Sequence, residues 1–145
     1  MVRISRLTDY GIQLMAALSR APSRALNARD LSGLAGMPEP TVRKLLKSLV
    51  RAHLLVSTRG VRGGYRLGRE AQEITVAQII AAIEGPLAVT RCNEPGADAC
   101  ERQQSCPLQQ NWRLVNQAIQ GALSNLTLSQ MAGTLPADWT GGGAP

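Results

Sequence analysis

Residues 26–55, LNARDLSGLAGMPEPTVRKLLKSLVRAHLL, decide the fold of this 145-residue chain. Apolar residues recur there with the period of an amphipathic helix, and the pattern is interrupted once, around Gly36. Asn27 suits the cap of a first helix, Gly36 suits its end, and Pro40 suits the first turn of a second helix. The residues expected to be buried are Ala28, Leu31, Leu34 and Ala35 in the first helix and Val42, Leu45, Leu46 and Leu49 in the second. The segment therefore predicts two short helices around a tight turn.

The second of these helices has an outer face that suits DNA. A helix can enter the major groove, where the base edges present a distinguishing pattern of donors and acceptors. Thr41 and Arg43 stand near the N-terminus of the helix, where base contacts usually arise. Its other cations suit phosphates, which add affinity without sequence information, and they are Lys44, Lys47 and Arg51. The helix is a candidate recognition helix.

A glycine-rich hairpin follows the two helices. Residues 55–58 and 65–67 predict two short strands, joined through the sequence RGVRGGY at 59–65. Its glycines let the backbone approach the sugar-phosphate surface, so that Arg59 or Arg62 reaches the minor groove. The sequence thus predicts a mainly α fold with a small β-wing, a winged helix-turn-helix that binds double-stranded DNA. The alternative is an ordinary hairpin on a basic but inert helical domain.

The charge of the chain is unevenly distributed. The net charge is +6, and residues 1–67 hold twelve of the 16 Lys and Arg residues but three of the ten Asp and Glu residues. A basic first half and an acidic second half favour a polyanion-binding module joined to a part with another role. A solubilising surface is the alternative. Because no paired acids, Ser-His-Asp set or phosphate-binding loop is present, neither an enzyme nor a small-molecule substrate is expected.

Further helices are expected on both sides of this module. Thr8 suits the N-cap of a first helix that ends near Arg20, and Thr75 suits the cap of a helix over 76–83 that stops at Gly85. A longer C-terminal helix carries apolar residues at the 4-3-4-3-4 spacing of a coiled coil, and these are Leu108, Trp112, Val115, Ile119, Ala122 and Leu126. This seam predicts a homodimer whose two recognition helices, about 34 Å apart, read a palindromic operator. Packing of the seam on its own domain is the alternative.

All three cysteines, Cys92, Cys100 and Cys106, fall in one polar stretch, CNEPGADACERQQSC. The start of the chain lacks the features of a secretory signal, and no stretch is long enough to span a bilayer, so the cytosol and no membrane contact are expected. Thiols stay reduced there, and three cysteines cannot all pair within one chain. Three thiolates on a loop suit an iron–sulfur cluster with a fourth ligand from elsewhere. A thiol switch, a zinc site and inert cysteines stay open as alternatives.

These features divide the chain into four parts. They are a winged helix-turn-helix domain over 1–85, a cysteine-containing cluster-binding loop over 86–106, a dimerisation helix with a return segment over 107–132, and a disordered tail over 133–145.

Several motifs in this order resemble the Rrf-type winged-helix regulators. They are LTDYG at 7–11, the helix-turn-helix, RGVRGGY at 59–65, the three-cysteine loop and CPLQQNW at 106–112. The family includes the iron–sulfur regulator IscR, the nitric-oxide-sensing repressor NsrR and regulators of the SUF cluster-assembly operon, and LTDYG with CPLQQNW looks most like the SUF branch. The resemblance covers roughly residues 1–132. It implies a cluster-sensing transcription regulator of SUF-type genes in the bacterial cytoplasm, with repression as the expected mode. A nitric-oxide- or redox-sensing repressor and a metal-free thiol switch are the alternatives.

The resemblance also implies which residues hold the cluster. In the family the three cysteines are ligands, so Cys92, Cys100 and Cys106 inherit that role, and a 2Fe-2S cluster is favoured over 4Fe-4S. IscR has a histidine three residues after its third cysteine, where this chain has Gln109, a poor iron ligand. NsrR-like proteins use an aspartate early in the first helix of the partner subunit, and Asp9 matches that place. An acid in a first helical turn is also favoured by the helix dipole alone. Local competitors as ligands are Glu94, Asp98 and Glu101.

Overall fold

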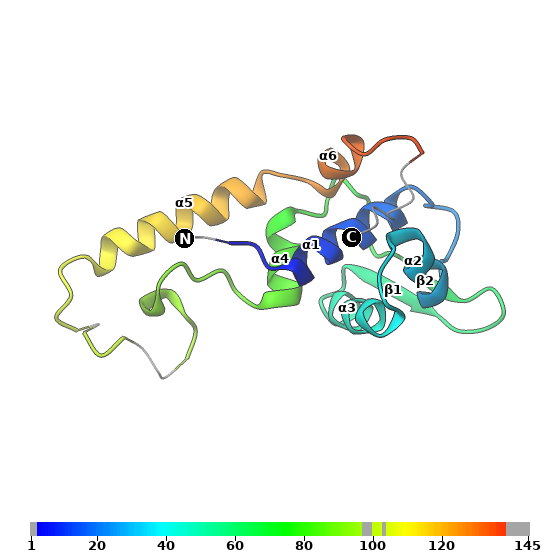
Figure 1. Cartoon of the computed structure of the whole chain (residues 1–145). Helices are drawn as coiled ribbons and strands as arrows, with labels where there is room; N and C mark the ends of the chain where they lie inside the picture. The colour runs from blue at the N-terminus through cyan, green and yellow to red at the C-terminus, as the bar shows by residue number, and fades with distance from the viewer. Residues whose placement is uncertain (1–2, 97–99, 103, 139–145) are drawn as a thin grey trace.

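The chain forms a set of helices with one two-stranded sheet in the computed structural model (Figure 1). The structure describes residues 3–96, 100–102 and 104–138. Its elements in chain order are α1 (Arg6–Ser19), α2 (Ala28–Ala35), α3 (Glu39–Arg51), β1 (Leu55–Thr58), β2 (Gly64–Leu67), α4 (Val76–Glu84), the short 3-10 helix η1 (Arg91–Asn93), α5 (Gln109–Ser124) and α6 (Leu128–Gly133). The predicted mainly α fold with a small β-wing is confirmed.

The helix-turn-helix of α2 and α3 forms as the sequence predicts. The Asn27 side chain accepts a hydrogen bond from the backbone N–H of Asp30 at 2.8 Å, and Gly36 ends α2 in the left-handed conformation with φ 62°. Helix α3 begins directly after Pro38, and the predicted Pro40 lies in its first turn, where the fixed φ of proline suits a helix. Its inner face is buried at the four expected positions, Val42, Leu45, Leu46 and Leu49.

Leu34 corrects the expected buried face of α2. The buried residues of α2 are Ala28, Leu31 and Ala35, whereas Leu34 is 37% exposed. Since an α-helix turns about 100° per residue, Leu34 lies roughly 90° around the helix from the middle of that stripe. Its expected burial was wrong because α2 buries only the narrow stripe that packs against α1 and α3.

Helix α1 begins earlier than predicted. Ser5 caps it rather than Thr8, since the Ser5 hydroxyl accepts a hydrogen bond from the Thr8 backbone N–H at 3.1 Å. Thr8 is fully buried instead, and its hydroxyl donates to the Glu84 carboxylate at the end of α4. Gly11 lies where α1 approaches α4, and a Cβ there would collide with the end of the Ile83 side chain. The N-terminal half of α1 is thereby fixed against α4.

The wing is tied to the helix-turn-helix by an additional bridge. Strands β1 and β2 pair antiparallel, with Leu55 opposite Leu67. The Tyr65 N–H donates to the Leu26 carbonyl at 2.8 Å, and the Leu26 N–H donates to the Tyr65 carbonyl at 3.1 Å. Gly64 permits this approach, because its φ is 149° and a Cβ there would lie 2.7 Å from the Leu26 carbonyl. The base of the wing is therefore held against the segment that enters α2.

Helices α4 and α6 each begin with a capping box. The pair Thr75 and Gln78 starts α4, as the predicted Thr75 cap requires, and Gly85 ends the helix with φ 89°. The pair Thr127 and Gln130 starts α6, whose Leu128 is fully buried in the core. These caps fix where the chain enters and leaves the last part of the fold.

Helix α5 extends away from the other helices, and the cysteine-containing segment lies near its N-terminal end (Figure 1). None of the residues of α5 is buried, and its main packing contacts are with α4 and η1. Leu108 is its N-cap and Leu126 follows its C-cap, so both lie just outside the helix. The helix is therefore shorter than the predicted seam, and at its C-terminal end Thr127 already adopts the extended conformation of the next cap. The role of the seam residues in a dimer stays a prediction.

The segment after α6 lies on α1. Leu135 is half-buried against the core, and the Arg20 guanidinium donates to the carbonyls of Leu135 and Pro136 at 2.7 and 2.8 Å. A disordered tail was expected over 133–145, of which residues 139–145 lie outside the described residues. The expected division into four parts stays a prediction. Within the described residues, no helix combines the length and the apolarity that a bilayer span requires.

Candidate nucleic-acid interface and cysteine loop

The outer side of α3 carries the cations predicted to contact DNA. Because the opposite stripe of α3 is buried in the core, these side chains face solvent. Lys44, Lys47 and Arg51 are exposed, and none of them is in an ion pair within the described part of the chain. Thr41, near the start of the helix, is half-buried. The three cations are therefore available to phosphates.

Arg43 differs from these cations because it is paired. Its Nε and Nη2 atoms lie 2.9 and 2.5 Å from Oε1 of Glu39, one turn earlier on α3. The two side chains are 64% and 37% exposed. Sequence reasoning singled out Arg43 but missed Glu39, although the i, i+4 spacing of an acid and a base is a known signal for such a pair.

Arg59 and Arg62 lie in the turn between β1 and β2, and both are exposed. The Gly63 N–H donates to the Gly60 carbonyl at 2.9 Å and closes this turn. A hollow of about 410 Å³ separates the turn from the loop before α2, and Arg62 lines it together with Arg24. Sequence reasoning did not distinguish Arg24 from the other cations of the basic half. The wing thus presents cations beside those of α3.

The three cysteines are free thiols, and each is half-buried. Cys92 lies in η1, whereas Cys100 and Cys106 lie in the irregular segment before α5. The Cys92 sulfur lies 3.1 Å from the Thr90 hydroxyl. Within the described residues, no three His, Cys, Asp or Glu side chains are gathered closely enough to hold a metal ion.

The residues predicted as candidates for the fourth cluster ligand lie in two separate parts of the chain. Asp9 is exposed in the first turn of α1, and its Oδ2 accepts a hydrogen bond from Gln13 at 3.1 Å. Glu94 and Glu101 are exposed in the cysteine-containing segment, and Asp98 lies outside the described residues. The role of Asp9 across a dimer stays a prediction.

Two asparagines anchor the start of the cysteine-containing segment on α5, and sequence reasoning missed both. The Asn116 side chain accepts from the Val89 N–H at 3.0 Å and donates to the Leu87 carbonyl at 3.1 Å. The Asn93 amide donates to the Trp112 carbonyl at 3.3 Å. These contacts join positions 19 to 29 residues apart, so no local sequence signal indicates them.

Glu84 anchors the other end of the connection, at the last residue of α4. Its carboxylate accepts hydrogen bonds from the Thr8 hydroxyl and, at 3.2 Å, from the Ser5 N–H. Hydrogen bonding by Ser5, and then by Thr8, lowers the pKa of Glu84 below its usual value against a smaller opposing effect of burial. The carboxylate therefore stays ionised as it holds the start of α1.

An apolar face remains exposed on and around α5. Leu108, Trp112, Val115 and Leu126 are between 39% and 50% exposed. Ile119, the remaining predicted seam residue, is half-buried. Large apolar side chains that share one face of a helix commonly mark a contact surface.

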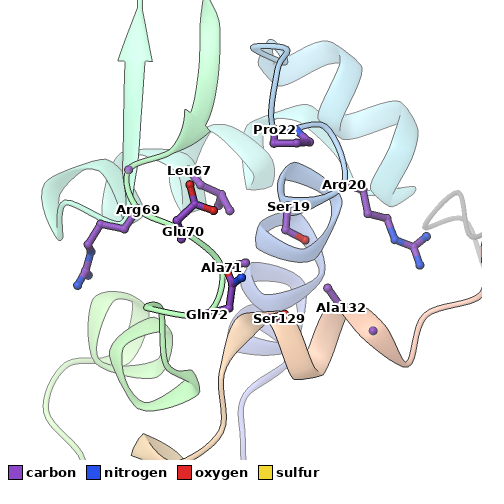
Figure 2. A pocket seen from close by; sticks show the side chains of 12 residues that line it. Ser19, Arg20, Pro22, Leu67, Arg69, Glu70, Ala71, Gln72, Ser129 and Ala132 are labelled. Atoms are coloured by element: carbon purple, nitrogen blue, oxygen red, sulfur yellow. The ribbon is translucent and has the colours of Figure 1, made fainter.

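A larger hollow lies on another side of the molecule. Its volume is about 650 Å³. Figure 2 shows the residues that line it, which come from the end of α1, the segment after β2, and α6. Arg20 lines it but is already bonded to the carbonyls after α6, and Arg69 points away from the other labelled side chains. Neither the cysteines nor the predicted DNA contacts line this hollow. It is separate from both candidate sites.

One known protein family matches almost the whole described chain. The model of the Rrf2 family, described as an iron-dependent transcriptional regulator, matches residues 4–134. The chain belongs to the Rrf2 family. This confirms the resemblance to Rrf-type regulators, and the relatives and solved structures that the chain is similar to are transcription regulators.

Individual Rrf2 relatives agree with this assignment. IscR of Serratia proteamaculans is 33% identical over 102 residues, which cover 70% of this chain and 61% of that protein. The structure of CymR, the global cysteine regulator of B. subtilis, has a TM-score of 0.72 at 26% identity and covers 94% of this chain and all of that one. The structure of T. potens IscR has a TM-score of 0.68 at 28% identity, with 91% and 87% covered.

Proposed function

We propose that this Rrf2 chain senses an iron–sulfur cluster and that Cys92, Cys100 and Cys106 hold it. The observation that carries the proposal is the place of three free, half-buried thiols on the one segment that joins α4 to α5. Soft thiolates are the ligands that iron–sulfur clusters prefer. A bound cluster would be lost during iron starvation or on reaction with oxidants or nitric oxide, so its presence would report these conditions. We propose SUF-type assembly genes as targets, repression as the mode and the bacterial cytoplasm as the location.

The donor set fits a cluster in its chemistry. The Thr90 hydroxyl and the Asn93 amide lie near the Cys92 sulfur, at 3.1 and 4.0 Å, and such donors tune the sulfur ligands of clusters. The three thiols supply one ligand fewer than the usual four, and Asp9 of the partner subunit is the proposed fourth ligand. Its exposure in the first turn of α1 leaves it accessible to a second chain. A 2Fe-2S cluster is the proposed type.

The basic surface supports a two-groove mode of DNA binding. We place α3 in the major groove, with Thr41 and Arg43 at base edges, and the wing in the minor groove through Arg59 or Arg62. The exposed, unpaired cations of α3 then contact phosphates, and they are Lys44, Lys47 and Arg51. Phosphate contacts add affinity that falls with salt, and base contacts add specificity.

The exposed apolar face supports a homodimer on a palindromic operator. Trp112 and Val115 are each 39% exposed on one face of α5, although both are large apolar residues. Pairing two such faces removes apolar surface from water, and this burial stabilises the dimer by about 25 cal/mol for each Å² of apolar surface. Leu108, Ile119 and Leu126 extend the proposed contact beyond this pair.

The anchors of the cysteine-containing segment suggest how the cluster and DNA binding are coupled. The segment starts two residues after Glu84, which is bonded to α1, and its first part is bonded to Asn116 of α5. Gathering the three thiols therefore pulls on α4 and α5 together. A coupling of about 1–3 kcal/mol between two sites is typical and changes affinity roughly 5–150-fold.

Anaerobic purification followed by visible absorption and by iron and sulfide analysis tests the proposal. We expect coloured protein, and we expect each Cys→Ala variant to lose the colour. Ser105→Ala, an exposed position in the same segment, is the matched control and should keep it. Asp9→Ala should bleach or destabilise the cluster. Colourless protein without iron or sulfide, even after reconstitution, would sink the cluster proposal.

A metal-free thiol switch is the second candidate. It is supported by the similarity to CymR, whose structure is described as that of a global cysteine regulator. This function predicts colourless protein whose operator affinity changes when an oxidant forms a disulfide. Iron and sulfide analysis of the anaerobically purified protein distinguishes the two functions, because the switch holds neither iron nor sulfide before an oxidant forms its disulfide.

A further inference from the structure

The ion pair at the start of α3 points to a residue that has no role so far in DNA reading. Among residues 3–96, 100–102 and 104–138, the pair of Glu39 with Arg43 is the one ion pair present. We propose that Glu39 is a specificity-determining residue, which orients the Arg43 guanidinium for a guanine in the major groove. The inference rests on the proposed function, in which α3 reads DNA.

The geometry of the pair leaves the reading edge of Arg43 free. Its Nε and Nη2 atoms both face Oε1 of Glu39, at 2.9 and 2.5 Å. The side edge of the guanidinium is therefore engaged, while the end edge, formed by Nη1 and Nη2, still has N–H groups to donate. Two parallel donors are what the O6 and N7 acceptors of guanine require. Arg43 remains 64% exposed and can present that edge to DNA.

The effect of Glu39 on affinity should be opposite to its effect on specificity. An exposed pair one helical turn apart contributes little to folding, so the ion pair itself adds little to the stability of α3. Its carboxylate also repels nearby phosphates, which weakens binding to every sequence. Glu39 thus lowers general affinity while it fixes a flexible arginine in one orientation, which reduces the rotamer freedom lost on base recognition.

A role of Glu39 in the helix dipole alone predicts a different effect on DNA binding. An acid in the first turn of a helix stabilises the helix whether or not DNA is bound, and its loss would change DNA binding equally for all sequences. The dipole role therefore leaves base preference unchanged. The preference for guanine at one operator position is the measurement that separates the two roles.

The experiment compares the purified full chain with its Glu39→Gln, Arg43→Ala and Asp30→Asn variants. Asp30→Asn is the matched control, since it makes the same charge change on α2, where the Asp30 side chain takes part in no ion pair within the described residues. Selection from a random DNA library with the wild type defines the operator. Fluorescence anisotropy then gives the affinity of each variant for the operator, for single-base substitutions of it and for random DNA.

We expect the wild type to prefer guanine at one symmetric position of each half-site and Arg43→Ala to lose that preference. Glu39→Gln should lose roughly tenfold in discrimination at the same position alone, within the range that a bidentate base contact supplies. It should also bind random DNA several-fold more tightly. Asp30→Asn should bind random DNA more tightly with discrimination unchanged.

Two results overturn the inference. Full discrimination by Glu39→Gln shows that Arg43 needs no positioning, and full discrimination by Arg43→Ala shows that it reads no base. A wild type that binds no DNA or selects no sequence contradicts the proposed function itself, so the two failures are distinguishable. Circular dichroism of each variant confirms that a loss of discrimination occurs in folded protein.

Discussion

The attachment of the wing to the helix-turn-helix gives the sharpest test of the fold, through Gly64→Ala. Gly64 has φ 149°, and a Cβ there would lie 2.7 Å from both the carbonyl carbon and the oxygen of Leu26 and 3.1 Å from the Asn27 nitrogen. All three atoms are backbone, so no side-chain rotation relieves the collision. The substitution should force β2 away from the segment that enters α2.

The expected loss of stability has two parts. The strain of a positive φ in a residue with a Cβ costs about 1–3 kcal/mol. Separation of the chains breaks both hydrogen bonds between Leu26 and Tyr65, each worth about 1 kcal/mol net. The free energy of unfolding should therefore fall by roughly 3–5 kcal/mol.

Gly60→Ala is the matched control for this prediction. Gly60 also has a positive φ, 110°, but nothing lies within 4 Å of the place of a Cβ. It should show the strain without the collision, and so retain about 2 kcal/mol more stability than Gly64→Ala. Urea unfolding followed by circular dichroism measures both. If the two variants unfold within about 0.5 kcal/mol of each other, the bridge does not hold the wing and the reasoning is refuted.

Three further predictions concern α5 and α4. Val115→Lys should raise the dissociation constant of the dimer at least about 30-fold, as for a central apolar contact, whereas Val56→Lys, similarly exposed on β1, should leave sedimentation unchanged. Asn116→Ala should lower the free energy of unfolding by about 1–3 kcal/mol through its two lost backbone bonds, and Asn111→Ala on the exposed side of α5 should change it by less than about 0.5 kcal/mol. The folded-state pKa of Glu84 is lowered, so its carboxylate stabilises the fold above the ordinary value of 4.5, and this contribution is lost as the pH falls through the lowered pKa. Urea midpoints should therefore fall less in Glu84→Gln than in the wild type as the pH drops below 4.5, and parallel curves would contradict this.

The sequence predicts most where the deciding interactions are local. Asn27 is three residues from the N–H that it caps, and Gly36 ends α2 by its own φ. Proline and glycine around the turn, and the apolar period of α3, act over one or two helical turns. The wing follows from glycines within a few residues of each other. The winged helix could therefore be predicted without knowledge of contacts between residues far apart in the sequence.

Errors arise where two local signals compete or where a contact is long-range. Ser5 and Thr8 both suit a cap, and the choice between them depends on Glu84, 76 residues beyond Thr8, which engages the Thr8 hydroxyl. The end of α5 depends similarly on the Thr127 cap of the next helix. The Asn116 anchor joins segments 27 and 29 residues apart. Such contacts form only once the helices have packed, so the spacing of apolar residues along the sequence does not indicate them.

The packing around α4 limits which helices can move when the cysteine-containing segment closes. Helix α4 contacts α1 and α3, and both the Glu84 bond and the close approach at Gly11 fix it to α1. Rotation of α4 within the DNA-reading module would break these contacts together. Helix α5 has no buried residue, and its placement relative to α4 is less constrained. In the proposed sensing function, closure of the cysteine-containing segment should therefore move α5 while the helix-turn-helix and the wing keep their structure. In a dimer paired through α5, this changes the spacing of the two recognition helices rather than the shape of either one.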